Sequence, residues 1–163
     1  MGPQADMIIE LKRVPWFAEL KQDHLKRMSA ITTLHTFKAG QTIFREGDRE
    51  DYLYVVQDGR VALDMYVPSR GKVLIYTAEQ WDIFGWSSVT PDVHQRTAGA
   101  IAVLESRVLC VEAEKLRRLC EVDHDLGYLV MRRLADIVAS RLMVTRLQLL
   151  DMFATPAEIK NDD

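Results

Sequence analysis

The spacing of hydrophobic residues divides the chain into a helical start, a long β region and a helical end. Over residues 5–30 apolar side chains recur every three or four positions, which predicts two short helices interrupted by Pro15. Over residues 31–112 the apolar runs shorten and become rich in Val, Ile, Tyr and Thr. Helical spacing returns over residues 113–152. The pattern predicts a mainly β fold with flanking helices.

Glycine punctuates the β region at the points where turns are expected. The turn glycines are Gly40, Gly47, Gly59, Gly71 and Gly85. They separate about seven or eight strand-like runs spaced by roughly ten residues, which is typical of a small antiparallel sandwich or jelly roll. The sequence therefore predicts a roll over residues 31–112.

The end of the chain predicts a short helix over residues 113–120 and a long one over 125–152, with Asp123 or Asp125 capping the long helix. At about 1.5 Å per residue the long helix spans about 40 Å, so we expect it to project from the domain. Its solvated face is expected to carry Arg132, Arg133, Arg141 and Arg146.

Two apolar stripes run along the long helix. The first, here called the seam stripe, contains Tyr128, Met131, Ala135, Val138, Leu142, Thr145, Leu149 and Met152. The second, here called the inner stripe, contains Val130, Leu134, Ile137 and Val144. The seam stripe has coiled-coil spacing and predicts a homodimer through residues 125–152, while the inner stripe packs on the domain. The alternative is one helix that covers the sheet with a broad apolar face.

Composition places the chain in a single-domain class. Its 163 residues are 48% hydrophobic with a net charge of -3, so we expect one domain over residues 5–152 and a short acidic tail over 153–163. Cys110 and Cys120 lack metal-site spacing, and the first 30 residues contain no signal or membrane-spanning run. We therefore expect a cytoplasmic protein without membrane attachment.

The segment around Gly85 contains the residues most suited to binding an anion. They are Phe84, Gly85, Trp86, Ser87 and Ser88, followed by Arg96, Thr97 and Ala98. Glycine permits close backbone approach, and a guanidinium offers paired donors to two phosphate oxygens. The serine and threonine hydroxyls add donors. Alternatively, Arg96 is an ordinary surface arginine of a strand, and Ser87 and Ser88 cap a helix.

The order of these elements resembles the cyclic nucleotide-binding domain of the catabolite activator and protein kinase A regulatory type. The resemblance covers about residues 8–152 and rests on Gly40, Gly47 and Gly59 together with the Arg96-Thr97-Ala98 run. It implies a jelly-roll-like β-roll with a long C-terminal dimerisation helix. It also implies a non-enzymatic sensor that binds cAMP, cGMP or another nucleotide-like anion and needs no cofactor or metal.

The resemblance also shows where this chain departs from the family. The family carries an acid at the position of Trp86, where it accepts the ribose hydroxyl, and a glycine at the position of Trp81. An indole has only a donor, and an unmade hydrogen bond costs about 1–3 kcal/mol. Three outcomes stay open: Trp86 stacks on a ligand bound differently, Trp86 fills the pocket so that nothing binds, or the nucleotide binds without the ribose contact.

By the same resemblance Thr145, within the run Arg141-Leu142-Met143-Val144-Thr145, faces a purine base. The alternative is that Thr145 is a polar seam position that fixes coiled-coil register.

No catalytic or metal-binding spacing is found among the histidines, although His94 lies in the anion-binding segment. Transcription factors of the family continue into a winged helix-turn-helix after the long helix, and the few residues left here predict no direct DNA binding. The alternative to a sensor is a ligand-free domain, plugged by Trp86, that recruits an unidentified protein partner as a dimer.

Overall fold

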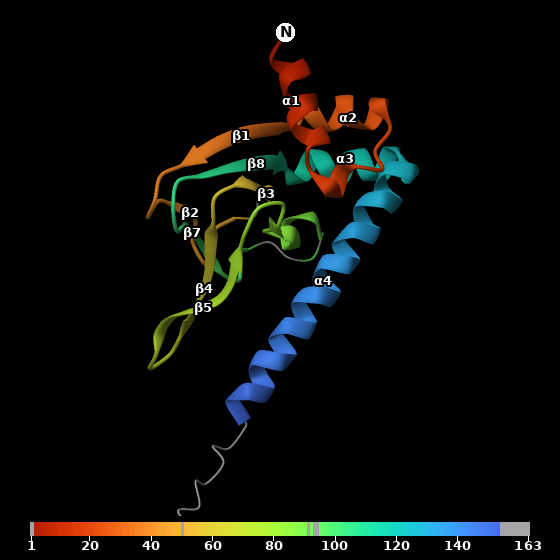
Figure 1. Ribbon diagram of the computed structural model, residues 1–163. Helices are drawn as coiled ribbons and strands as arrows, with labels where there is room; N and C mark the ends of the chain where they lie inside the picture. The colour runs from red at the N-terminus through yellow and green to blue at the C-terminus, as the bar shows by residue number, and fades with distance from the viewer. Residues whose placement is uncertain (1, 50, 91, 93–94, 154–163) are drawn as a thin grey trace, which may run out of the picture.

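The fold is a β-roll with helices gathered at one end and a long helix along its side (Figure 1). The computed structural model describes residues 2–49, 51–90, 92 and 95–153. The helical elements are α1 (Pro3–Lys12), the 3-10 helix η1 (Pro15–Phe17), α2 (Gln22–Ser29), the 3-10 helix η2 (Trp86–Val89), α3 (Ala113–Val122) and α4 (His124–Phe153). The strands are β1 (Thr32–Phe37), β2 (Thr42–Phe44), β3 (Tyr52–Asp58), β4 (Val61–Val67), β5 (Gly71–Ala78), β6 (Ile83–Phe84), β7 (Gly99–Ala102) and β8 (Ser106–Glu112).

The strands form two four-stranded antiparallel sheets, in the orders β1-β8-β3-β6 and β2-β7-β4-β5. This confirms the predicted jelly-roll-like architecture. Each of the five turn glycines has a positive φ, from 67° at Gly85 to 100° at Gly59. Glycine adopts this conformation without the Cβ clash that other residues meet, so the sequence pattern located the turns correctly.

Two apolar cores lie on opposite sides of the first sheet. The roll core contains the buried residues Phe44, Tyr54, Val56, Val61, Ala78, Phe84, Ala100, Val108, Cys110. The helical core joins α1, α2, α3 and α4 to residues of β3, β6 and β8 such as Leu53, Ile83 and Leu109. Alternation along β3 explains the division, because successive side chains point to opposite faces of a strand.

The N-terminal segment contains one element beyond the two predicted helices. Pro15 begins the 3-10 helix η1 rather than only separating α1 from α2. Proline suits the first position of a helix because its missing N–H would have no intrahelical acceptor there. Phe17, the last residue of η1, is buried in the helical core and fixes this segment against the domain.

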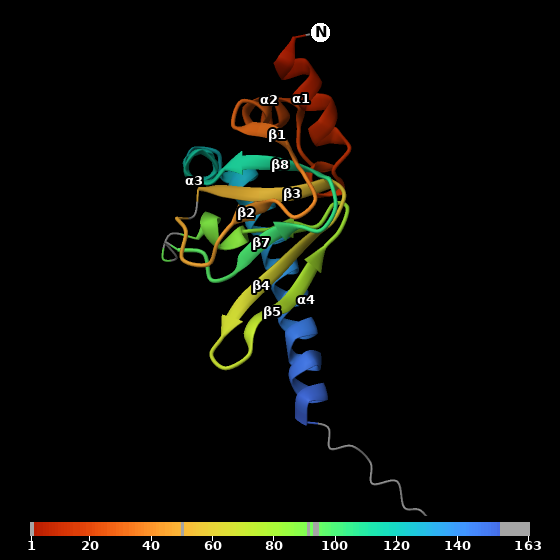
Figure 2. The same cartoon turned by 90° about the vertical axis from the view of Figure 1, so that its left-hand side faces the viewer.

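α4 extends past the tip of the β4–β5 hairpin, as Figures 1 and 2 show, which agrees with the predicted projection. In the inner stripe, Val130 and Leu134 are buried and Ile137 packs against the helical core. Val144 was assigned wrongly to this stripe, because α4 has already left the domain there and the residue is 37% exposed. The described seam side chains, from Tyr128 to Leu149, are exposed in the single chain.

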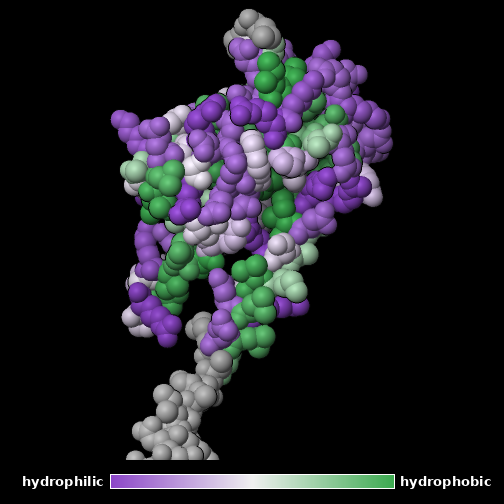
Figure 3. All heavy atoms as spheres, in the orientation of Figure 1, coloured by the Kyte–Doolittle hydropathy of each residue, from purple (hydrophilic) through white to green (hydrophobic). Residues whose placement is uncertain are grey.

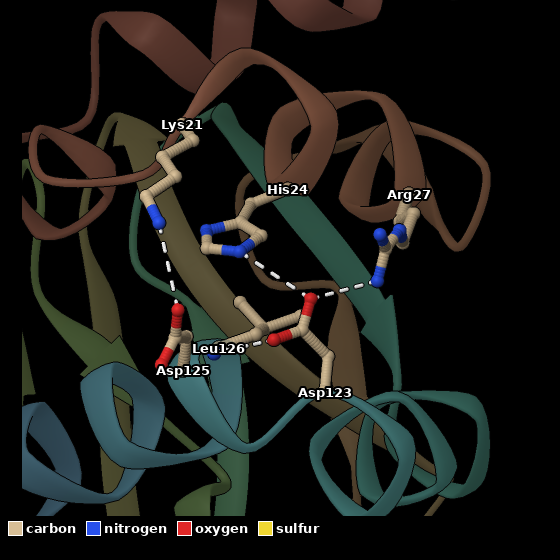
Figure 4. Close-up of polar contacts among 6 residues, drawn as sticks. All are labelled: Lys21, His24, Arg27, Asp123, Asp125 and Leu126. Carbon is tan, nitrogen blue, oxygen red and sulfur yellow. Dashed lines mark hydrogen bonds and ion pairs between the residues drawn. The ribbon is translucent and has the colours of Figure 1, made fainter.

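The start of α4 is fixed by a polar cluster drawn in Figure 4. Asp123 accepts the backbone N–H of Leu126 at 3.1 Å, which confirms it as a cap of the long helix. Its other carboxylate oxygen lies 2.7 Å from Arg27 Nη1 and 3.3 Å from His24 Nε2, both on α2. The amide bond and the two α2 side chains hold the pKa of Asp123 below its ordinary value, against the opposing effect of burial. α4 is thus anchored to α2 at its first turn.

Candidate anion-binding site

Arg96 is held by backbone pairing with the turn that follows β2. Its N–H donates to the Asp48 carbonyl at 2.8 Å, and its carbonyl accepts the N–H of Gly47 at 2.8 Å. Its side chain is turned into the protein, since the residue is only 3% exposed. The structure therefore places the guanidinium inside the roll, and the alternative of a surface arginine does not apply.

Aromatic rings surround the guanidinium of Arg96. Its Cζ lies 4.4 Å from the ring centroid of Phe44 and 5.4 Å from that of Tyr54. Tyr54 is in turn stacked on Phe84, with centroids 4.9 Å apart and an interplanar angle of 12°. A cation over an aromatic face is attracted by the ring quadrupole, and the attraction grows when water is excluded. The rings thus support a buried positive charge.

Burial also changes the phenol within this aromatic group. Loss of solvation raises the pKa of Tyr54 to about 12, and the nearby positive charge of Arg96 opposes part of that rise. Tyr54 is therefore a neutral ring at physiological pH and contributes its π face rather than a negative charge.

The two terminal nitrogens of Arg96 donate to backbone carbonyls. Nη1 lies 3.1 Å from the Gly85 oxygen, and Nη2 lies 2.6 Å from the Tyr52 oxygen. A Cβ on Gly85 would lie 2.6 Å from Nη1 and 3.0 Å from Tyr54 Cδ2, and Gly85 has φ of 67°. Both the conformation and the close approach therefore require glycine at this position.

Ser88 closes the Gly85 turn, here meaning residues 85–89. Its hydroxyl donates to the Gly85 carbonyl at 2.7 Å, and its own carbonyl accepts a hydrogen bond from Arg117 Nη1 of α3. Ser88 is fully buried, and its hydroxyl bonds back to a carbonyl of its own turn; the capping alternative does not hold, because no described side chain caps the start of η2. The Ser87 carbonyl accepts the N–H of Thr90 at 2.9 Å, which ends the short helix.

Trp86 lies on the helical side of the turn. Its half-buried side chain packs against the helical core, whereas Phe84 two residues earlier belongs to the roll core. The indole is therefore not among the rings that line the interior around Arg96.

The other residues predicted for the site are Thr97, Ala98 and Thr145. Thr97 is exposed and Ala98 is half-buried directly after Arg96. Thr145 is exposed on α4, and its hydroxyl donates to the Arg141 carbonyl at 2.9 Å. The structure thus brings Phe84, Gly85, Ser88 and Arg96 together and leaves Thr145 on the free part of the helix. His94 lies outside the described residues.

A second polar group connects the roll to α4, and the sequence did not indicate it. The Tyr76 hydroxyl donates to Asp82 Oδ2 at 2.8 Å, and Asp82 Oδ1 lies 3.8 Å from Arg141 Nη2. The Arg141 Cζ lies 3.1 Å from the centroid of the Tyr76 ring. Loss of solvation lowers the pKa of Arg141 to about 10. The expectation of a solvated Arg141 was wrong, because α4 crosses the flank of β5 at this point.

The aromatic partners of Arg96 were also missed. Phe44 and Tyr54 are inward positions of β2 and β3, and their only sequence signal is an aromatic residue at an inward position of a predicted strand. Within the described residues no group of three or more His, Cys, Asp and Glu side chains has the arrangement of a metal site. None of the described helices combines the length and apolar character that crossing a membrane requires.

The comparisons with known proteins agree with this architecture. The chain is 28% identical over 119 residues to the CRP-like cAMP-activated global transcriptional regulator of Mycobacterium tuberculosis, covering 73% of this chain and 51% of that protein. It is 27% identical over 135 residues to Glutaminase 1 of Bradyrhizobium diazoefficiens, covering 83% of this chain and 21% of that protein. The chain thus spans about half the length of the regulator and a smaller part of the glutaminase.

Among solved structures, a cyclic nucleotide-binding domain from Methylobacillus flagellatus aligns with a TM-score of 0.76, over 96% of this chain and 86% of that one. At 20% identity this likeness concerns the fold. The sequence profile described as "Cyclic nucleotide-binding domain" matches residues 34–123, which are more than half of the chain and include the Gly85 turn and Arg96. The chain therefore belongs to the cyclic nucleotide-binding domain family.

Proposed function

We propose that this domain is a non-enzymatic sensor that binds cAMP, cGMP or another phosphate-containing nucleotide in the roll and signals through α4. The observation that carries the proposal is the inward guanidinium of Arg96 beside the Gly85 turn. A buried arginine that faces a backbone turn is suited to a planar, bidentate and charge-assisted contact with a phosphate. Family membership supports the same ligand class.

Binding would begin with an exchange of acceptors. Nη1 and Nη2 donate to the carbonyls of Gly85 and Tyr52, and an anionic phosphate oxygen is a stronger acceptor than a neutral carbonyl. A phosphate at Arg96 therefore competes with these carbonyls and releases the Gly85 turn. Ligand binding and movement of the turn are coupled in this way.

The released turn is connected to the helices through Ser88. Its carbonyl accepts from Arg117 of α3, and α3 meets α4 at Asp123. A shift of the turn thus reaches the anchored start of α4, while the Asp82 and Arg141 pair fixes its middle. A ligand changes the pose of α4 only by its differential affinity for the two arrangements.

Trp86 favours the sensor over a plugged, ligand-free module. Because its side chain packs against the helical core, the ring does not occupy the roll interior beside Arg96. An indole still cannot accept the ribose hydroxyl, so we propose a nucleotide held mainly through its phosphate. Thr145 approaches a base in this proposal only through a movement of α4 or from a second chain.

We further propose a homodimer through residues 125–152. Figure 3 shows apolar side chains on the distal part of α4, where Leu142 is 48% and Leu149 is 51% exposed. Exposed apolar stripes of this kind indicate a partner surface. The free thiols of Cys110 and Cys120 support a cytoplasmic setting. In this proposal the domain contacts neither DNA nor a membrane, and any protein partner follows the pose of α4.

Isothermal titration tests the proposal, because it measures binding without relying on Trp86, which one of the variants removes. cAMP and cGMP are titrated into the wild type, Arg96→Lys and Trp86→Glu. We expect a saturable signal in the wild type, at least tenfold weaker binding in Arg96→Lys, and tighter binding in Trp86→Glu, since the acid accepts a ribose hydroxyl. Equal affinities of the wild type and Arg96→Lys would exclude a phosphate site at Arg96.

A further inference from the structure

A second cleft lies outside the roll, where α4 passes the turn between β5 and β6. Its volume is about 350 Å³, and its lining combines η1, the end of β5 with the following turn, and α4. Ile83 of the lining belongs to the helical core, whereas Tyr76 also packs against the roll core. The lining contains neither Arg96 nor its neighbours Phe44, Tyr54 and Gly85, so the cleft is distinct from the interior around Arg96. Clefts of roughly 300–1,000 Å³ are the usual size for small-molecule sites.

Aromatic rings form much of the cleft surface. Trp16 of η1, Trp81 and Tyr76 all line it, and both indoles are half-buried. Among the residues that the structure describes, the indole N–H of Trp16 has no acceptor. Rings arranged in this way suit a planar heterocycle, since bases stack on aromatic side chains irrespective of sequence.

Trp81 has a backbone conformation that favours glycine. Its φ is 70°, and the peptide is held by donation of the Trp81 N–H to the Val56 carbonyl at 2.7 Å. A side chain with a Cβ is costly in this region, and such strain collects at binding and functional sites. A large aromatic side chain is therefore present at a position whose backbone conformation by itself favours glycine.

The polar lining carries no net charge. Arg133 and Arg141 are balanced by Asp82 and Asp136, which disfavours a polyanion. Arg133 is already paired with Glu19 and Arg141 with Asp82.

Two polar side chains of α4 are available on the cleft wall. Within the described part of the chain, Asp136 makes no ion pair and the Ser140 hydroxyl makes no hydrogen bond, and the two lie one helical turn apart. A carboxylate acceptor beside a hydroxyl matches a sugar that presents adjacent hydroxyl groups. A plain hydrocarbon would leave both without partners.

We propose that this cleft is a second ligand site, which binds a neutral nucleoside. The base stacks on Trp16 and Trp81, and the sugar hydroxyls donate to Asp136 and exchange hydrogen bonds with Ser140. Because the lining spans both the roll and α4, the bound nucleoside ties the helix to the roll. The site does not use Arg96, so it stands apart from the phosphate site proposed above.

Isothermal titration with adenosine, which has no phosphate, tests the second site. Trp81→Gly removes the ring and keeps the backbone, since glycine accepts a φ of 70°. Asp136→Ala removes an exposed acceptor without touching a core. We expect each change to weaken adenosine binding at least tenfold.

Two control variants should leave adenosine binding unchanged. Asp151→Ala removes another exposed carboxylate of α4, and this residue lies outside the cleft lining, so it matches Asp136→Ala in charge and side-chain loss. Arg96→Lys alters the roll interior and is likewise outside the cleft lining.

Three results would overturn the second site. They are the absence of saturable adenosine binding to the wild type, unchanged affinity in Asp136→Ala, and a loss in Arg96→Lys equal to that in Trp81→Gly, which would place adenosine in the roll. Asp136→Ala keeps the test decisive if Trp81→Gly fails to fold. If cAMP did not bind, that result would contradict the proposed phosphate site at Arg96 and would leave the proposed second site standing.

Discussion

The Gly85 carbonyl accepts a hydrogen bond from Arg96 Nη1 at 3.1 Å, at a place where a Cβ on Gly85 would lie 2.6 Å from that nitrogen. The turn and the arginine therefore depend on each other. The missing Cβ of Gly85 leaves space for the guanidinium, and the guanidinium donates a hydrogen bond to the turn inside the roll. A phosphate that takes over the guanidinium must disturb this contact.

Gly85→Ala should destabilise the protein more than Gly40→Ala does. Both glycines have positive φ, of 67° and 79°, which costs alanine about 1–2 kcal/mol in free energy of unfolding. Only the Gly85 Cβ meets close neighbours, and overpacking adds about 1–3 kcal/mol, whereas space around Gly40 is open. Urea denaturation measures the difference, and equal losses would mean that the close approach to Arg96 carries no energy.

Arg96→Lys should lower the free energy of unfolding by about 1–3 kcal/mol even without ligand, because one partly buried carbonyl loses its donor. An ammonium cannot reproduce the planar fork that reaches both the Gly85 and the Tyr52 carbonyls. Arg49→Lys, at a side chain that is 87% exposed, is the control and should change stability little. Chemical denaturation of both variants gives the comparison. If Arg96→Lys left the free energy of unfolding unchanged, the hydrogen bonds of the Arg96 guanidinium would not stabilise the domain.

Acid should weaken the anchor of α4 through Asp123. The native pKa of this carboxyl lies below its ordinary value, chiefly because it accepts the Leu126 N–H, with further contributions from His24 and Arg27. A depressed native pKa adds stability above the unfolded value of about 4, and that stability is lost as pH falls through the native pKa.

Asp123→Asn isolates this contribution, since asparagine still caps a helix but carries no charge. Melting temperatures measured between about pH 2.5 and pH 6 should fall less steeply on acidification in the variant than in the wild type. Parallel curves for the two proteins would assign the acid sensitivity to other carboxyl groups.

The proposed dimer predicts a difference between two neighbouring substitutions. Leu142→Asp places a charge in the seam stripe and should convert the dimer to monomer. Met143→Asp is one residue away, outside the seam stripe, and should leave the dimer intact although Met143 is 67% exposed. Sedimentation at micromolar concentration measures the oligomeric state of both variants. A monomeric wild type, or equal effects of the two changes, would remove the coiled-coil assignment.

Local signals in the sequence predicted much of the fold. The turn glycines, the cap at Asp123 and the change from strand to helix spacing each depend on residues that are near neighbours in the chain. Arg96 was selected because an arginine follows a glycine and hydroxyl residues in its own segment; the structure turns its side chain inward, and its role in binding stays a prediction. Features of this kind need no knowledge of how distant segments pack.

Contacts between distant segments were the ones the sequence did not reveal. Phe44 and Tyr54 meet Arg96 only after the roll closes, and Arg141 reaches Tyr76 only because α4 crosses the flank of β5. The periodicity of a helix fixes which residues share a face but not where the helix leaves the domain. Val144 was misassigned for this reason.

The most direct measurement is a crystal structure of the domain grown with cAMP. We predict that the phosphate lies within hydrogen-bonding distance of both terminal nitrogens of Arg96 and that the Gly85 carbonyl has moved away from Nη1. A cAMP molecule bound elsewhere, or a phosphate in the roll with the Arg96 to Gly85 hydrogen bond still intact, would contradict this prediction.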